Sequence, residues 1–416
     1  MEQMERRPER ALLVSVDTGE FDVESSLSEL YELIRSAGAD PVGSVVQKRP
    51  HVEAGTCVGT GMLREIAAHC EREEIDLLVF DRELTPTQIR NIEEVTGVRV
   101  IDRTQLILDI FALRARSREG RLQVELAQLK YLMPRLTGRG VAMSRLGGGI
   151  GTRGPGESKL ETDRRHIRRR IESLREQLDD VEKHRALLQK RRKKDGVITA
   201  ALVGYTNAGK STLMNRLTQA GVLAENKLFA TLDPTARALT LPGGSTIMLI
   251  DTVGLVRRLP HQLVDAFRST LEEAALADVL VIVSDGASRE MLQQHETVEE
   301  VLASLGATEQ PRIEVINKVD LGLSSPSIPG AVMVSAATGE GLEELRARIA
   351  RELQKTYAPV TFFLPFSQYG VLSQIRPLGR VVNESYTDEG TELTIILSQT
   401  DRDRIVSKYG KDIVRG

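Results

Sequence analysis

One stretch of the chain places two glycines, a lysine and a serine at a spacing that suits phosphate binding. It reads Gly204-Tyr205-Thr206-Asn207-Ala208-Gly209-Lys210-Ser211. An apolar run at 197–203 predicts a strand before this motif, and a helical pattern follows it. In this context the backbone N–H groups of the loop and of the helix start can hold phosphate oxygens. Lys210 is expected to reach the β- and γ-phosphates of a nucleotide, and Ser211 to place its hydroxyl on Mg²⁺.

A second motif, Asp251-Thr252-Val253-Gly254, follows an apolar run at 245–250 that predicts another strand. From this position Asp251 can hold Mg²⁺ through a water molecule, and the N–H group of Gly254 can meet the γ-phosphate. Lys210 and Gly254 are therefore candidate catalytic residues.

Two further motifs can select the base. Asn317-Lys318-Val319-Asp320 follows a predicted strand at 312–316, and Ser335-Ala336-Ala337 follows one at 331–334. Asp320 can accept two hydrogen bonds from the N1–H and N2 amine of guanine, donors that adenine lacks. Asn317 is expected to buttress the loops, Lys318 to pack its stem over the ring, and the N–H group of Ala336 to meet guanine O6. The four motifs, each at the end of a predicted strand, predict a site for GTP and GDP.

Three positions near this site leave alternatives open. The segment 228–239 should supply a threonine that closes over Mg²⁺ and the γ-phosphate, and Thr231 and Thr235 both fit by position. Leu255 stands where Ras-like enzymes carry a glutamine that orients the attacking water. Slow intrinsic hydrolysis, accelerated by a partner, is therefore expected. Asn207 is either a ligand for K⁺, which would be a second cofactor, or a residue that stabilises the loop.

The elements that must position these motifs divide the chain into four predicted segments. Residues 1–112 alternate strand-like and helical runs, which favours an α/β domain with a partly parallel sheet. Residues 113–195 predict a basic helical hairpin, 196–355 the nucleotide-binding domain and 356–416 a small tail domain. The predicted fold class is α/β: a P-loop GTPase (Ras-like) domain, preceded by an α/β domain with a helical hairpin and followed by a small α+β domain.

The predicted hairpin carries an apolar seam and an excess of positive charge. Apolar residues recur at helical spacing at Leu122, Leu126, Leu129, Met133, Leu160, Ile167, Ile171, Leu174, Leu178, Val181 and Leu188. Residues 114–194 hold 23 Lys and Arg against 10 Asp and Glu, whereas the whole chain has a net charge of −3. Either this segment contacts a polyanion or it is a solvated helix face.

A glycine-rich tip at 138–158 joins the two predicted helices. Glycine adds nothing to a core, so the tip is either a loose connection or a surface that orders against RNA. The candidate RNA contacts are Arg139, Arg145, Arg153, Arg164, Arg165, Arg168 and Arg169. Farther on, Arg257 and Arg258 follow the DTVG motif, and a solvated pair is favoured there over contact with RNA or nucleotide.

Composition excludes several classes of protein. The 416 residues are 41% hydrophobic and 28% charged, which excludes wholesale disorder. Cys57 and Cys70 are too few for a disulfide scaffold or a four-cysteine zinc site and favour a reducing compartment, hence the cytoplasm. No apolar run approaches the roughly 18 residues of a spanning helix. No signal peptide is visible either.

The motifs GYTNAGKS, FATLDPT, DTVG, NKVD and SAA, with GGGIGTRGPGES before them, together resemble the HflX family of GTPases. The resemblance covers about residues 10–355 and is weakest in the tail. It implies that Thr231 is the threonine that binds Mg²⁺ and makes it a third candidate catalytic residue. It also places the surrounding segment at the nucleotide: Phe229, Ala230, Thr231, Leu232 and Asp233.

The resemblance further implies a cytoplasmic protein, expected to be monomeric, that binds the 50S subunit and its rRNA and splits stalled or idle 70S ribosomes, especially under stress. In that family the glycine-rich tip reaches toward the peptidyl-transferase centre. Two rivals use the same features: a GTPase that assists ribosome assembly or RNA modification, and a GTPase that regulates a protein complex. Nucleotide binding by the N-terminal domain is a third possibility, which the absence of a P-loop there disfavours.

Overall fold

The computed structural model describes residues 7–137, 159–194, 196–218, 228–229, 232, 235–258, 273–324 and 327–415. The chain separates into two compact units, each considered by itself. Unit 1 comprises Met1–Asp179, Asn226–Leu232 and Arg258–Phe267, and unit 2 comprises Asp180–Glu225, Asp233–Arg257 and Arg268–Gly416. The division into four segments that the sequence predicts stays a prediction.

Unit 1 is built on a parallel sheet with the strand order β2-β1-β3-β4. Its strands are β1 (Arg10–Asp17), β2 (Asp40–Lys48), β3 (Leu77–Phe80) and β4 (Arg99–Asp102). Its first four helices are α1 (Val23–Ala37), α2 (Thr60–Arg72), α3 (Pro86–Thr96) and α4 (Arg103–Arg114). Local signals set several ends: the Asp22 side chain caps α1, Thr85 and Gln88 form a capping box at α3, and left-handed Gly38 and Gly97 end these two helices.

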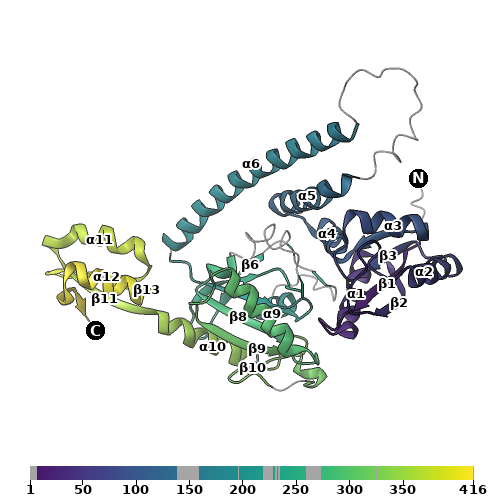
Figure 1. Ribbon diagram of the computed structural model, residues 1–416. Coiled ribbons are helices and arrows are strands. Elements are labelled where there is room, and N and C mark those ends of the chain that lie inside the picture. Colours follow the sequence, from purple (N-terminus) through teal and green to yellow (C-terminus); the bar gives the residue numbers. More distant parts are fainter. Residues whose placement is uncertain are drawn as a thin grey trace, which may run out of the picture. The chain divides into compact units, whose positions relative to one another are not determined.

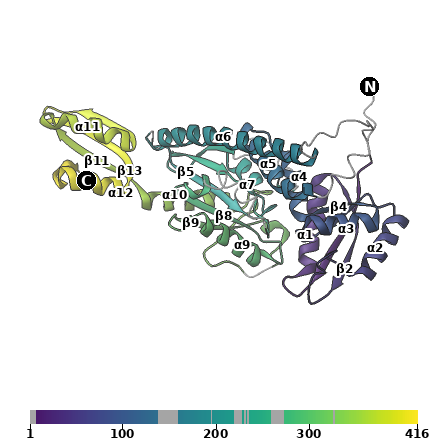
Figure 2. The ribbon, with the colours of Figure 1, turned by 45° about the horizontal axis from the view of Figure 1, so that its top comes forward.

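Side-chain alternation along the strands divides the core of unit 1 between the two faces of the sheet. Leu12, Val14 and Val16 of β1 pack with Leu63 and Ile66 of α2 in one hydrophobic cluster. Helices α1 and α4 contact each other, and α1 also contacts β1. Figure 2 shows α1 and α2 on opposite sides of the strands. This is the layered α/β domain that the sequence predicts.

The two helices of the predicted hairpin are α5 (Arg118–Leu132), followed by the 3-10 turn η1 (Met133–Thr137), and α6 (Lys159–Lys194). Leu122 and Leu126 of α5 pack with Ile171 and Leu174 of α6, as the predicted seam requires. The seam does not continue to the end of α6, because the Leu188 side chain is 43% exposed. The sequence prediction was wrong at Leu188, since heptad spacing marks an apolar stripe along a helix but does not show how far the stripe is buried. The tip lies outside the described residues.

Unit 2 contains a six-stranded sheet with the order β10-β9-β8-β5-β7-β6, in which only β6 runs antiparallel to its neighbour. The strands are β5 (Thr199–Gly204), β6 (Thr235–Thr240), β7 (Thr246–Asp251), β8 (Val279–Asp285), β9 (Arg312–Asn317) and β10 (Val332–Met333). The helices are α7 (Lys210–Thr218), α9 (Met291–Ser304) and α10 (Leu342–Thr356), with the short η4 (Val319–Leu321).

The core of this sheet explains which helix covers which face. Leu213 of α7 and Leu345 of α10 share one buried cluster with Leu202, Ile313 and Val315 of the strands. Helix α9 contacts β8 and β5. Figure 1 shows it beside these strands. Because neighbouring residues of a strand point to opposite faces, Glu314 points away from the cluster that holds Ile313 and Val315.

The last segment forms a second sheet in unit 2, with the order β12-β13-β11-β14 and antiparallel pairing throughout. Its strands are β11 (Tyr357–Pro365), β12 (Arg380–Tyr386), β13 (Gly390–Ser398) and β14 (Val414–Arg415). The helices are α11 (Tyr369–Ile375) and α12 (Gln399–Tyr409), with the short turns η5 (Phe366–Gln368), η6 (Arg376–Leu378) and η7 (Lys411–Ile413). Phe362, Leu393, Ile395 and Ile405 lie in its core. The predicted fold class is confirmed.

Two expectations drawn from composition can be compared with the structure. Among the described helices, none is long and apolar enough to cross a membrane. Cys57 and Cys70 are free thiols, both buried in unit 1.

Candidate functional site: a nucleotide pocket at one edge of the sheet

The glycine-rich loop leaves β5 at Gly204 and enters α7 at Lys210, so the predicted strand–loop–helix context is present. A Cβ atom at Gly204 would lie 2.2 Å from the carbonyl oxygen of Val283, so only glycine lets β5 and β8 approach this closely. Asn207 and Gly209 have φ angles of +61° and +89°. This left-handed backbone turns the loop over the start of α7, where N–H groups can receive phosphate.

Asn317 at the end of β9 joins the loop to the third and fourth motifs. Its Nδ2 donates to the Ala208 carbonyl at 2.8 Å, and its Oδ1 accepts from the N–H of Ala336 at 3.0 Å. Asn317 is buried at 1% exposure. One amide therefore satisfies a donor and an acceptor on loops that are far apart in sequence. This is the buttressing that the motif predicts, with Ala336 as its partner.

Lys210, Ser211 and Asp251 lie together below the loop. Lys210 Nζ donates to the carbonyls of Gly204 and Tyr205 at 3.0 and 2.9 Å. Burial lowers the pKa of Lys210 to about 8, and the charge of Asp251 opposes this shift. Ser211 Oγ donates to Asp251 Oδ2 at 2.6 Å. A hydroxyl and a carboxylate at this spacing are hard oxygen donors, so the residues present fit a Mg²⁺ ion.

The DTVG segment packs closely on the glycine-rich loop. A Cβ at Gly254 would lie 2.9 Å from Thr206 Cα, so this contact requires glycine. The Thr206 N–H donates to the Leu255 carbonyl at 2.7 Å, and the Leu255 N–H to the Gly204 carbonyl at 3.2 Å. Leu255 is 2% exposed. Its side chain is thus a packing residue, and it offers no polar group to a water molecule.

Sequence reasoning missed a polar contact that extends this pairing. The hydroxyl of Tyr205 accepts a 2.7 Å hydrogen bond from the backbone N–H of Arg257. Arg257 in turn forms an ion pair with Glu290 at 2.5 Å. A tyrosine at a variable position of the loop carries no signal for such a contact, and Glu290 lies in a separate part of the chain.

The base-selecting motif is held by two polar contacts. Lys318 Nζ pairs with Asp285 Oδ2 at 2.7 Å, at the end of β8. Asp320 Oδ1 accepts a 2.6 Å hydrogen bond from Ser335 Oγ, and the Asp320 residue is exposed. Ser335 thereby ties the third motif to the fourth. Asp285 was not predicted from sequence, although its place after a buried strand at the carboxyl edge of the sheet was an available signal.

The other residues predicted to bind the nucleotide fall into three groups: some lie in unit 2, some lie in unit 1, and some lie outside the described residues. Thr252 and Val253 are buried behind the loop, where Thr252 Oγ1 donates to the Leu202 carbonyl at 2.7 Å. Phe229 and Leu232 belong to unit 1, where the Phe229 ring meets Phe111 edge to face at 4.5 Å. A contact of these two residues with the nucleotide stays a prediction. Outside the described residues lie Ala230, Thr231 and Asp233.

Both arginines that follow the DTVG motif form ion pairs, which corrects the expectation of a freely solvated pair, although Arg258 remains exposed. Arg257 is tied to Glu290 as described above. Arg258 belongs to unit 1, where its Nη2 approaches the two Asp81 carboxylate oxygens at 3.1 and 3.2 Å and its guanidinium lies 3.9 Å from the centre of the Phe21 ring. The sequence gives no reason to distinguish Arg257 from Arg258, whereas in the fold the two side chains pair with different partners.

The arginines predicted to contact RNA differ in whether the structure describes them and in how exposed they are. Arg139, Arg145 and Arg153 lie outside the described residues. On α6, Arg165, Arg168 and Arg169 are exposed and Arg164 is partly buried. The neighbouring Arg170 is paired with Glu125 of α5 at 2.7 Å.

The carboxyl ends of parallel strands meet at one edge of a sheet, and this edge carries all four motifs. A glycine-rich loop, its lysine and serine, a facing aspartate and an NKVD loop in this arrangement define a P-loop GTPase. Family models match in the same order. One described as GTP-binding GTPase N-terminal matches residues 24–112, one described as GTP-binding GTPase Middle Region matches 114–192, and one described as 50S ribosome-binding GTPase matches 199–318.

Curated relatives extend the match to nearly the whole chain. GTPase HflX of Caldanaerobacter subterraneus subsp. tengcongensis is 49% identical over 412 residues, which cover 98% of this chain and 96% of that protein. GTPase HflX of Escherichia coli (strain K12) is 41% identical over 392 residues and 92% of each chain. The chain belongs to the HflX family of GTPases and hydrolyses GTP. A solved structure described as the SsGBP and GDP complex is 27% identical, with a TM-score of 0.48, over 83% of this chain and 99% of that chain.

Proposed function

We propose that this GTPase is a switch that binds the large ribosomal subunit through its basic hairpin and dissociates stalled or idle 70S ribosomes. One observation carries the proposal: α6 exposes Arg165, Arg168 and Arg169 on a helix of 36 residues. Exposed arginines on one helix suit a phosphate backbone. The description of the family model that matches residues 199–318, 50S ribosome-binding GTPase, supports the same partner.

In this proposal each pocket residue has a chemical role. Lys210 contacts the β- and γ-phosphates, Ser211 binds Mg²⁺ and Asp251 holds it through water, while Thr231 and Gly254 contact the γ-phosphate side. The Mg²⁺ ion neutralises phosphate charge. Asp320 accepts hydrogen bonds from the guanine, and Asn317 holds the loops of Asp320 and Ala336. The Ala336 N–H donates to Asn317 in this structure, so it would exchange that bond for one to guanine O6 when nucleotide binds.

The side chain of Leu255 sets the proposed mode of regulation. A buried leucine cannot orient an attacking water, so intrinsic hydrolysis is slow and a bound partner completes the catalytic arrangement. GTP and GDP forms must bind that partner with different affinities if hydrolysis is to change binding.

The decisive experiment measures GTP turnover with and without 50S subunits and 70S ribosomes, together with sedimentation of the subunits. We expect strong stimulation and a shift from 70S particles toward free subunits. Reversing two exposed charges, Arg168→Glu with Arg169→Glu, should weaken binding to 50S subunits. It should also flatten its salt dependence by about 0.7 to 0.9 in the slope of log K against log salt for each lost phosphate contact.

The matched control reverses two exposed arginines of α12, Arg402→Glu with Arg404→Glu, which changes net charge equally. Equal loss in both double variants would indicate a general charge effect and would contradict the hairpin contact. Binding confined to precursor particles would favour the assembly alternative. Absence of stimulation and of co-sedimentation would favour regulation of a protein complex, for which weak salt dependence is expected.

We further propose K⁺ as a second cofactor held by Asn207. This residue is exposed at the turn of the loop, with a φ of +61°. A monovalent cation there would supply positive charge that no arginine of the loop provides. Turnover should be faster in K⁺ than in Na⁺ at equal ionic strength, and Asn207→Ala should remove the difference. Equal rates in the two salts would contradict this proposal and leave Asn207 as a loop-stabilising residue.

A further inference from the structure

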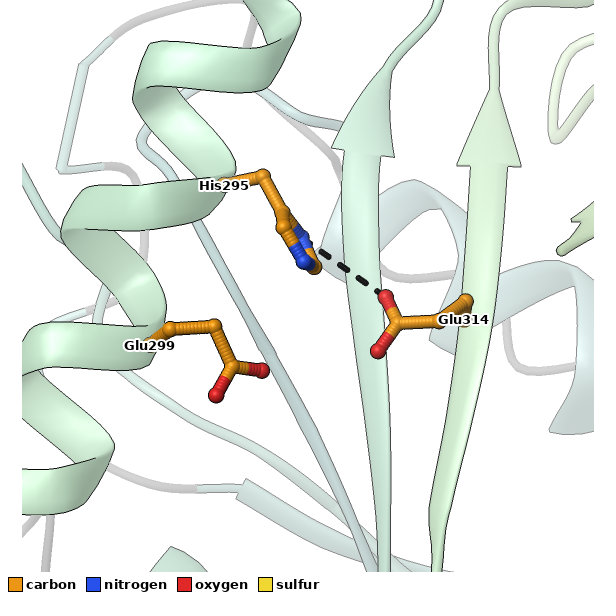
Figure 3. Close-up of side chains that lie close together, drawn as sticks. All are labelled: His295, Glu299 and Glu314. Carbon is orange, nitrogen blue, oxygen red and sulfur yellow. Dashed lines mark ion pairs between the residues drawn. The ribbon is translucent and has the colours of Figure 1, made fainter. Parts of the chain in front are cut away.

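Three side chains outside the nucleotide pocket converge between α9 and β9. His295 and Glu299 are four residues apart on α9, so they lie on the same face of the helix. Glu314 lies on β9 and points toward this helix, because its neighbours Ile313 and Val315 fill the core on the other face of the sheet. Figure 3 shows the imidazole between the two carboxylates.

The spacing of these groups suits one metal ion. A ligand atom from each of the three residues lies within 4.8 Å of the others, and His295 Nδ1 is 3.6 Å from Glu314 Oε2. Zn²⁺ sits about 2.0 to 2.2 Å from nitrogen and oxygen ligands, so neighbouring ligand atoms of a tetrahedral site are about 3.4 Å apart. The atoms are thus at most about 1.4 Å farther apart than this, a gap that rotation of the glutamate side chains can close, and a fourth position would be left for water.

Burial supplies a second, independent observation. The side chains of His295 and Glu314 are only 18% and 21% exposed. Their facing atoms, Nδ1 and Oε2, are fully buried and have no hydrogen-bond partner among the described residues. Unsatisfied buried polar atoms are uncommon and costly, and a cation that takes one lone pair from each removes that cost.

The charges around the cluster are compatible with a divalent cation. Burial, and secondarily the charge of Glu299, raises the pKa of Glu314 to about 7, while burial lowers the pKa of His295 and favours the neutral imidazole that ligates metals. Arg312 pairs with Glu299 and donates to the Ala307 carbonyl at 2.9 Å. One arginine therefore faces two carboxylates, which leaves a net negative site when both are ionised. Arg312 also competes with the ion for Glu299.

We propose that His295, Glu299 and Glu314 form a binding site for a divalent transition-metal ion, with Zn²⁺ the best match, separate from the nucleotide-linked Mg²⁺. One nitrogen and two carboxylate oxygens are a donor set that Zn²⁺ accepts and that Mg²⁺, which prefers oxygen donors, does not favour. The ion links α9 to β9, the strand that ends at Asn317. Its expected effect is therefore a more stable G domain rather than a new reaction.

The test uses the full-length protein without a histidine tag, stripped with EDTA and desalted into buffer with excess Mg²⁺. Calorimetric titration with Zn²⁺ should show one site per chain, and Co²⁺ should give the visible absorption of a low-coordinate nitrogen and oxygen site. Zn²⁺ should also raise the midpoint of thermal unfolding. His295→Ala and Glu314→Gln should each weaken Zn²⁺ binding at least about tenfold.

Two further variants make the result specific. His69→Ala removes a histidine of unit 1 that lies outside the cluster, and Zn²⁺ binding should not change. Arg312→Met removes the competing cation, so Zn²⁺ binding should become stronger. Retention of GTP binding by each variant reports that the G domain is folded. Wild-type Zn²⁺ affinity in both His295→Ala and Glu314→Gln, or no saturable binding to the wild-type protein, would overturn the proposal.

Discussion

Gly209→Ala is expected to abolish nucleotide binding at physiological concentrations, lowering GDP and GTP affinity by at least about 100-fold. The added Cβ would lie 2.2 Å from Asn317 Nδ2, and the φ of +89° is strained for any residue with a side chain. Asn317 must then move, and it holds both the Ala208 carbonyl and the N–H of Ala336. One methyl group thus displaces the phosphate loop and a base-reading loop together. Fluorescence titration with a labelled GDP measures the loss.

Gly243→Ala is the matched control for this substitution. Gly243 has nearly the same backbone strain, with a φ of +92°, but a Cβ there meets nothing within 4 Å. Both variants should lose roughly 1 kcal/mol of unfolding free energy from backbone strain. Only Gly209→Ala should lose affinity for GDP and GTP. Wild-type affinity in Gly209→Ala would show that Asn317 does not couple the two loops.

Asp320→Asn is expected to lower GTP affinity by about 100- to 10,000-fold, because two hydrogen bonds to a charged acceptor are lost at about 1.5 to 3 kcal/mol each. The asparagine amide also presents a donor to the guanine amine, which is itself a donor. Xanthine carries an oxygen at that position, so XTP should bind this variant better than GTP does. Competition of GTP and XTP against labelled GDP gives both affinities.

Asp388→Asn provides a charge-matched comparison, since it removes one exposed carboxylate from the C-terminal sheet. Its GTP and XTP affinities should equal those of the wild-type protein. If Asp320→Asn kept its preference for GTP over XTP, guanine would not be read by Asp320, and the contact of Asp320 with Ser335 would be structural only.

Local patterns predicted much of the fold. The apolar runs that predict strands at 245–250 and 312–316 match β7 and β9 to within a residue at each end. These runs succeed because a buried strand needs a short apolar stretch and polar or glycine-rich residues at its ends. The helical seam was predicted correctly at Ile171 and wrongly at Leu188, since spacing cannot show how far an apolar stripe is buried.

Parts of the site could not be predicted because they depend on residues that the chain brings together only when folded. The hydrogen bond from the Arg257 backbone to Tyr205, and the contrast between Arg257 and Arg258, have no sequence signal. The cluster of His295, Glu299 and Glu314 could not be predicted either. The spacing of His295 and Glu299 on one helix is visible in the sequence, but nothing in the sequence shows that Glu314 lies opposite them.

The sequence by itself determined that this protein binds and hydrolyses a guanine nucleotide, because each motif does its chemistry through neighbouring residues at a strand end. Only the tertiary structure decided which groups Asn317 holds, the Ala208 carbonyl and the Ala336 N–H, and that Leu255 is a packing residue. Such roles depend on which strands lie side by side. Spacing along the chain fixes local geometry, whereas strand order, set by packing of the whole core, fixes which distant groups meet.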